Sequence, residues 1–276
     1  MNDRICFYAQ PFHGISSYCD MVDAAVQYQL AGVEGFSQFE FSVPDVKAAM
    51  KVKKYADEKH IKFPCFSVYI NLVGEDFEQM LARIKGYAEV AAALGSPYLH
   101  HTIAANCSEP AEVLPYKEEL YARGVECVRE VYDYAKTLGV KTIYEDQGYI
   151  FNGVKGFGRF LDEVNRDVGV VADFGNIYQS HDTIEDFIRA FADRVVHAHI
   201  KDVALTVEQG PYGLKTLSDR YFNETPIGMG EVDIPGAINL LKQAGYQGYY
   251  GIENGGYEKN SPEVDRMLKL IDGWLK

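Results

Sequence analysis

Four segments of the chain place ionisable side chains at or just beyond the end of a short β-rich run. Glu145 lies in KTIYEDQG, Asp173 ends VGVVAD, Glu253 ends GYYGIE, and residues 197–202 read HAHIKD. A carboxylate or a charged imidazole is costly to bury unless it is paired or binds a metal ion. The recurrence of such residues at the end of four runs therefore indicates one shared site.

The HAHIKD stretch has a two-residue alternation. Side chains point to opposite faces of a strand in turn, so His197, His199 and Lys201 share one face, and Ala198 and Ile200 share the other. The apolar face suits packing beneath helices, and the polar face must then point inward. We expect His197 to lie deeper, with His199 and Lys201 nearer the open end.

Three carboxylates and an imidazole that converge supply both negative charge and ligand geometry. This set of donors suits a hard or borderline divalent ion, Mn²⁺, Mg²⁺ or Co²⁺, with Zn²⁺ also possible. A structural zinc site would use cysteine, and these segments contain none. The residues thus predict a divalent metal site that leaves room for substrate oxygens.

A repeated pattern of strand and helix surrounds these segments. Short β-rich runs alternate with amphipathic stretches such as FEQMLARIKGYAEVAAAL, several of which end at a glycine, as Gly95 and Gly139 do. The expected strands are 4–9, 32–37, 62–70, 97–103, 141–146, 168–173, 194–200 and 248–253.

Eight strands that alternate with helices predict either a closed barrel or an open doubly wound sheet. The count of strands, the length of 276 residues and the lack of a GxGxxG motif after the first strand favour the barrel. We therefore expect an α/β protein with one domain over residues 1–276, a single (β/α)8 barrel. Its active site should lie at the carboxyl ends of the strands.

Residues 202–231 make the connection between the last two strands unusually long. The segment has little periodicity and several turn residues, and in a barrel it would open beside the active site. It is either a lid over that site or a surface insertion, and the sequence does not decide between them.

Composition narrows the classes of partner. The chain has 27 basic and 40 acidic residues, a net charge of −13, which argues against a nucleic-acid partner. No apolar run approaches the ~20 residues of a membrane span, and the start shows no signal peptide. The scattered cysteines suit a reducing cytoplasm; they are Cys6, Cys19, Cys65, Cys107 and Cys127. We expect a cytoplasmic protein that acts on a small neutral molecule.

Further candidates surround the expected mouth. His100 and His101 point to opposite faces of their strand, so at most one of them points inward. Gln10 and His13 follow the first strand, and Asn71 follows the third. The residues that we expect to bind substrate are Lys201, His101, Asn71 and His197.

The four motifs together resemble the sugar phosphate isomerase/epimerase family with its xylose isomerase-like barrel. The resemblance covers nearly the whole chain and is most specific in GMGEVDIPGAINLLKQAGYQGYYGIEN. That superfamily includes ketose 3-epimerases, hydroxypyruvate isomerases, inosose dehydratases and the endonuclease IV type of apurinic endonuclease. The resemblance implies a divalent ion held by Glu145, Asp173, His199 and Glu253, with Glu145 and Glu253 also acting as the acid and base.

Two positions depart from the epimerase pattern. Epimerases often carry a histidine three residues after the strand-six aspartate, where this chain has Asn176. They also carry an arginine six residues after the metal histidine, where this chain has Leu205. Endonuclease IV needs more histidines and a surface for DNA, which Asn176 and the net charge argue against.

The resulting mechanism is removal of a proton α to a metal-bound carbonyl, through an enediolate. Glu145 and Glu253 approach from different sides, so the proton can return to the opposite face or to the neighbouring carbon. The predicted activity is an isomerase or epimerase of a small sugar, keto-sugar or polyol, with a homo-oligomer possible by analogy.

Two alternatives stay open. One is a lyase on the same scaffold, an inosose-type dehydratase or a 3-keto-glycoside eliminase. The other is a non-catalytic sugar-binding or partner subunit. The presence of both glutamates argues against the second, because binding alone needs no pair of opposed bases.

Overall fold

Eight strands close into a parallel barrel in the computed structural model, which describes residues 3–8, 12–105, 117–210, 213–254, 256–258 and 260–276. The order around the barrel is β1-β12-β8-β7-β6-β5-β4-β3. The bounds are β1 Ile5–Tyr8, β3 Gly32–Phe36, β4 Phe66–Val68, β5 Tyr98–His101, β6 Lys141–Glu145, β7 Gly169–Asp173, β8 Val195–Ile200 and β12 Tyr249–Ile252. The predicted barrel is confirmed, and each strand overlaps a predicted run.

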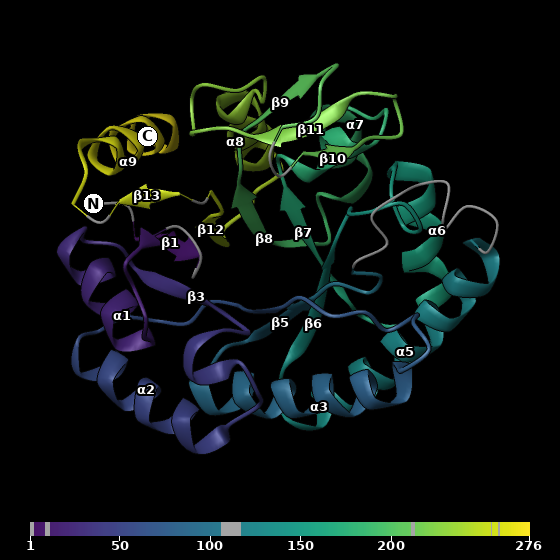
Figure 1. Cartoon of the computed structure of the whole chain (residues 1–276), viewed down its shortest axis with the longest axis horizontal. Coiled ribbons are helices and arrows are strands. Elements are labelled where there is room, and N and C mark those ends of the chain that lie inside the picture. Colours follow the sequence, from purple (N-terminus) through teal and green to yellow (C-terminus); the bar gives the residue numbers. More distant parts are fainter. Residues whose placement is uncertain (1–2, 9–11, 106–116, 211–212, 255, 259) are drawn as a thin grey trace.

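Helices surround the barrel on the outside (Figure 1). The described helices are α1 Tyr18–Gln27, α2 Val46–Glu58, α3 Phe77–Leu94, α5 Lys117–Thr137, α6 Val154–Val164, α7 Ile184–Phe191, α8 Ile234–Gln243 and α9 Pro262–Leu275, with 3-10 turns η1 Phe39–Phe41 and η3 Asn176–Gln179. None of them is long and apolar enough to cross a membrane.

Helix α7 shows how the sequence sets these elements. Thr183 begins the helix with a capping box, in which its side chain and that of Asp186 exchange hydrogen bonds with each other's backbone N–H. Ile184, Phe187, Ile188 and Phe191 follow at helical spacing and are all buried. The helix therefore presents one apolar face to the barrel.

The barrel interior is layered. Cys65, Ile143 and Val171 form a small apolar cluster, separate from the main core. Glu145 and Asp173 lie two residues further along the same strands, on the same inward face. The interior therefore changes from apolar to ionisable towards the carboxyl ends of the strands.

The long segment after β8 folds into a small sheet of its own. Strands β9 Val203–Thr206, β10 Leu214–Lys215 and β11 Tyr221–Glu224 pair antiparallel in the order β10-β11-β9. They lie together near α7 and α8 (Figure 1). A second small pair joins β13 Tyr257–Glu258 to β2 Phe12–His13. The three-stranded sheet supplies Leu214, Phe222 and Glu224 to the region around the barrel mouth.

Candidate metal and substrate site

The four predicted metal ligands come together at the barrel mouth. Glu145 and Asp173 end β6 and β7, His199 lies near the end of β8, and Glu253 directly follows β12. One oxygen or nitrogen from each lies within 4.8 Å of the others. These four strands are consecutive around the barrel, so the cluster occupies one half of its rim.

The cluster is dense in negative charge around one imidazole. His199 Nδ1 lies 2.8 Å from Glu253 Oε2, 3.6 Å from Asp173 Oδ2 and 3.7 Å from Glu145 Oε2. Burial alone would lower the pKa of His199, but the carboxylates of Glu34 and Glu253 outweigh it and raise that pKa well above its usual value. The site strongly favours a positive charge at its centre.

Two carboxylate oxygens of the cluster show that a metal ion fits. Glu145 Oε2 and Asp173 Oδ2 are buried and have no hydrogen-bond partner among the described residues. The other oxygen of Asp173 accepts hydrogen bonds from Gly175 N and Asn176 N, each at 2.9 Å, which turns Oδ2 towards the cluster. Unpaired buried oxygens beside an imidazole are a donor set for a divalent cation.

Lys201 extends the site towards the cavity. Its Nζ lies 2.7 Å from Glu253 Oε1, 3.3 Å from Asn176 Oδ1 and 3.7 Å from Glu224 Oε1. Burial opposes its charge, but Glu253 and Asp173 outweigh burial and raise the pKa of Lys201 well above its usual value. Lys201 is therefore a buried cation at the edge of the cluster, as the strand alternation predicts.

A cavity of about 540 Å³ lies over the cluster. Tyr8, Phe36 and Phe222 give it apolar walls, and Gln147 and Gln179 give it neutral polar groups. Cavities of this size hold small ligands. Its lining also includes Glu145, Lys201 and Glu253.

His100, rather than His101, is the histidine that faces the cluster. His100 Nε2 lies 3.5 Å from Glu145 Oε1, and its ring lines the cavity. His101 points the other way, where its Nε2 lies 2.9 Å from Tyr144 Oη and its Nδ1 2.9 Å from Thr102 O. His101 lines an adjoining cavity of about 340 Å³, and its role in substrate binding stays a prediction.

The remaining predicted residues lie further from the cluster. Asn71 Oδ1 accepts hydrogen bonds from the backbone of Val73 and Gly74, which holds it in a turn beside a neighbouring pocket. His13 is exposed, and Gln10 lies outside the described residues. Substrate binding by Asn71 stays a prediction.

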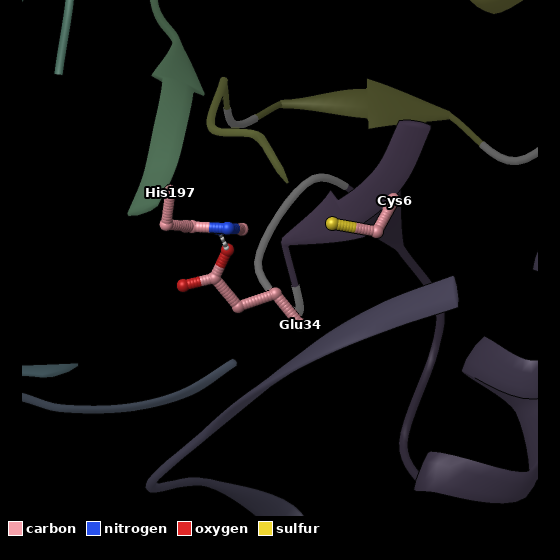
Figure 2. Close-up of side chains that lie close together, drawn as sticks. All are labelled: Cys6, Glu34 and His197. Atoms are coloured by element: carbon pink, nitrogen blue, oxygen red, sulfur yellow. Dashed lines mark hydrogen bonds and ion pairs between the residues drawn. The ribbon is translucent and has the colours of Figure 1, made fainter. Parts of the chain in front are cut away.

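Glu34 on β3 is a central residue that the sequence analysis does not single out. It is fully buried, and its carboxylate contacts His197 Nε2 at 2.7 Å, His199 Nε2 at 3.1 Å and Ser67 Oγ at 2.7 Å. Figure 2 shows Glu34 and His197 meeting inside the barrel, with Cys6 nearby. A carboxylate inside the apolar run GVEGF was the available signal. His197 is thus held deep in the barrel, away from the cavity lining.

Comparison with known proteins agrees with this geometry. The family model described as xylose isomerase-like TIM barrel matches residues 22–276. Two curated relatives are named inosose isomerase: one from Halalkalibacterium halodurans is 26% identical over 210 residues, and one from Bacillus licheniformis is 28% identical over 179. Their names agree with the predicted class of sugar isomerase.

The extent of these matches differs. The first alignment covers 74% of this chain and 70% of the relative, and the second covers 63% and 60%. A solved structure of a xylose isomerase-like TIM barrel protein from Mycobacterium smegmatis in complex with magnesium superimposes with a TM-score of 0.71 at 17% identity. It covers 99% of this chain and 98% of that one, which shows a shared fold.

Proposed function

The chain belongs to the xylose isomerase-like TIM barrel family, and we propose that it is a divalent-metal-dependent isomerase or epimerase of a small sugar, keto-sugar or polyol. One observation carries the proposal: Glu145 and Glu253 belong to one cluster with an imidazole and both line the cavity. Strands β7 and β8 lie between theirs, so the two carboxylates reach a bound molecule from different directions.

The ion would be held by Glu145, Asp173, His199 and Glu253. Manganese, magnesium and cobalt suit this set of oxygen and nitrogen donors, and zinc is a further candidate. When bound, the ion supplies Lewis-acid polarisation of a substrate carbonyl, which makes the neighbouring C–H more acidic.

The proton itself is moved by the chain's own carboxylates. Burial alone would raise the pKa of Glu145, but His100 and His199 outweigh it and hold that pKa well below its usual value. Glu145 is therefore ionised and ready to remove a proton. Glu253 accepts a hydrogen bond from the Lys201 ammonium at 2.7 Å, so this pair supplies a proton from Lys201 to the other face, which inverts the carbon. Return of the proton held by Glu145 to the adjacent carbon isomerises the substrate instead.

The cavity suits an uncharged ring that carries many hydroxyls. Gln147, Gln179 and Thr102 supply neutral hydrogen-bonding groups, and Phe36 and Phe222 supply apolar walls for C–H faces. Lys201 is already paired with Glu253 and Glu224, so it is not a free site for phosphate. With relatives named inosose isomerase, we propose a cyclic keto-polyol as the substrate class.

Solvent exchange tests the function. The manganese-loaded protein is incubated in D₂O with a panel of inososes and keto-hexoses, and deuterium at the carbon next to the carbonyl is followed by NMR. We expect exchange into at least one compound, abolished in Glu145→Gln and retained in Glu58→Gln, which alters an exposed carboxylate at the end of α2. No exchange into any compound would overturn the proposal, and full exchange by Glu145→Gln would overturn the base assignment.

One contact also favours the lyase as a second candidate. The Lys201 ammonium lies 2.7 Å from Glu253 Oε1, so that pair can deliver a proton to a departing β-hydroxyl. The same D₂O reactions discriminate the two activities. Loss of water gives an enone with new ultraviolet absorbance, whereas isomerisation gives none.

We also propose a reducing compartment, the cytoplasm, as the place of action. Cys6, Cys65 and Cys127 are buried free thiols and Cys19 is a partly buried one, whereas Cys107 lies outside the described residues. Free thiols persist where the surroundings are reducing.

A further inference from the structure

We propose that Glu34 is the positioning residue of this site: it fixes the ring of His199 towards the metal cluster and, through Ser67 and His100, the carboxylate of Glu145. The inference rests on the proposed function, because it takes His199 as a ligand and Glu145 as the base. Glu34 is not itself among the residues that line the cavity, and it acts through its neighbours.

The first arm runs to His199. Glu34 Oε1 already accepts a hydrogen bond from Ser67 Oγ at 2.7 Å, and Glu34 Oε2 lies 2.7 Å from His197 Nε2, so both oxygens act as acceptors. An ionised carboxylate only accepts hydrogen bonds, so His199 Nε2, at 3.1 Å from Glu34 Oε1, must carry a hydrogen. The ring therefore turns Nδ1 towards Glu145, Asp173 and Glu253, and an ion that displaces the proton from Nδ1 would bind that nitrogen while Nε2 keeps its hydrogen.

The second arm runs to Glu145. Ser67 Oγ donates to Glu34 Oε1 at 2.7 Å, so its oxygen is free to accept from His100 Nδ1, which lies 3.1 Å away. The other nitrogen of His100 lies 3.5 Å from Glu145 Oε1. The orientation of Glu34 therefore sets that of the His100 ring against the base.

The backbone opposite Glu34 leaves room for its carboxylate. A Cβ at position 251 would lie 2.5 Å from Glu34 Oε2 and 3.2 Å from His199 Cδ2, so glycine is required on that side of β12. The third partner, His197, contacts the same Oε2 at 2.7 Å. Hydrogen bonds from Ser67, His197 and His199, and the space left by the glycine at position 251, hold the Glu34 carboxylate in one orientation.

The group Cys6, Glu34 and His197 also has metal-ligand spacing, yet it is better explained as part of this network. Both oxygens of Glu34 already accept hydrogen bonds from Ser67, His197 and His199. Cys6 Sγ lies 3.6 Å from Tyr250 O, and burial raises the pKa of this thiol well above its usual value. A neutral thiol and a saturated carboxylate are poor ligands, so we expect one ion per chain rather than two.

Metal affinity is the first test. Chelator-treated wild type, Glu34→Gln and Cys6→Ser are titrated with Co²⁺ by calorimetry, and the visible Co²⁺ spectrum of each is recorded. We expect Glu34→Gln to bind about 10- to 100-fold more weakly with a changed spectrum, which is the usual effect of losing such a partner. Cys6→Ser alters an equally buried neighbour of Glu34 and should match wild type. Equal affinity and spectra in Glu34→Gln would overturn the inference.

The Ser67→Ala variant distinguishes the effect of Glu34 on His199 from its effect on Glu145. This change cuts the path to His100 and Glu145 but leaves both histidine contacts of Glu34. Because Glu145 is also a ligand, we expect a cobalt affinity that falls less than in Glu34→Gln, which disturbs His199 too. The kcat for the exchange reaction should be lower by roughly 10- to 100-fold, because a misplaced base costs that much. An unchanged kcat would remove the second arm and leave the first.

Histidine NMR tests the inference without a buried substitution. In zinc-loaded wild type with ¹⁵N-labelled histidine, His199 should show a protonated Nε2 and a metal-shifted Nδ1. The reverse pattern would overturn the inference even if Glu34→Gln failed to fold. Absence of any metal binding by wild type would instead count against the proposed function, so the two failures are distinguishable.

Discussion

At the scale of single residues, the two histidines of HAHIKD differ although they share one strand face. Burial lowers the pKa of His197, so it donates to Glu34 as a neutral ring. His199 faces Glu34 on one side and three carboxylates on the other, which raises its pKa well above the usual value. The two histidines that contact Glu34 therefore have different roles. His197 holds the Glu34 carboxylate in place, and His199 carries a positive charge or binds the metal ion.

His101 offers a test of burial at the same scale. Burial is the main cause that lowers its pKa from 6.5 to about 4. Between these values the unfolded chain binds a proton that the folded chain does not, so His101 stabilises the fold fully above pH 6.5 and progressively less as the pH falls towards 4. Between pH 7 and pH 5, the free energy of unfolding of wild type should therefore fall by roughly 2 kcal/mol more than that of His101→Gln.

Urea unfolding at pH 7 and pH 5 measures this difference, and comparing the change within each protein removes any constant cost of the substitution. His181→Gln alters an exposed histidine and should keep the pH dependence of wild type. Identical pH dependence in His101→Gln and wild type would mean that His101 is protonated in the folded chain at pH 5.

Strand alternation in the sequence predicts the site residues that lie at strand ends. Glu145, Asp173, His199 and Glu253 each lie at a strand end, where position along one strand is enough to predict direction. It did not reach Glu34, because the importance of that residue comes from His197 and His199, which lie 163 and 165 residues away in the sequence. Of the pair His100 and His101 it selected His101, whereas His100 is the ring that faces Glu145.

At the scale of elements, long periodic segments were predictable and short ones were not. The barrel strands alternate with amphipathic helices, and that pattern fixes fold class. Strands β9, β10 and β11 span only two to four residues each, too few for a period to show. They are held by long-range contacts, and Leu214, Phe222 and Glu224 from this small sheet line the cavity.

Asp202 attaches this small sheet to the barrel. Its Oδ2 accepts from Gly228 N and Gly230 N at 2.8 and 2.9 Å, and its Oδ1 accepts from Val203 N at 2.9 Å. Asp202→Asn replaces one acceptor with a donor, and hydrogen bonds to a charged group contribute about 1.5–3 kcal/mol each. We expect faster proteolysis within 203–231 and a KM raised about tenfold, measured by limited trypsin digestion and steady-state kinetics.

The matched control for Asp202 is Asp219→Asn in the same segment. Asp219 makes an exposed ion pair with Lys215, so its change should alter neither proteolysis nor KM. If Asp202→Asn digests like wild type and keeps its KM, the sheet is held by its other contacts, and the attachment assigned to Asp202 is wrong.

At the scale of the whole molecule, closure of the barrel brings part of the chain's excess negative charge together at the barrel mouth. The net charge is −13, and four consecutive strands bring three carboxylates of that excess within 4.8 Å of one imidazole. Without a cation the folded chain bears this repulsion, whereas the unfolded chain does not. Binding of an ion by the folded state alone should therefore couple directly to global stability.

We expect the apparent melting temperature to rise when a divalent ion is added to chelator-treated protein. An ion at 100 times its Kd stabilises the folded state by about 2.7 kcal/mol, which for a domain of this size corresponds to roughly 5–8 °C. Thermal unfolding with Mn²⁺, Mg²⁺, Co²⁺ and Zn²⁺ in turn measures the shift and ranks the ions. Asp173→Asn keeps an oxygen for Gly175 N and Asn176 N but loses the free carboxylate oxygen, so its shift should be much smaller. Since the rise comes from one site formed by four strands, a melting temperature indifferent to all four ions would contradict both the metal site and the function built on it.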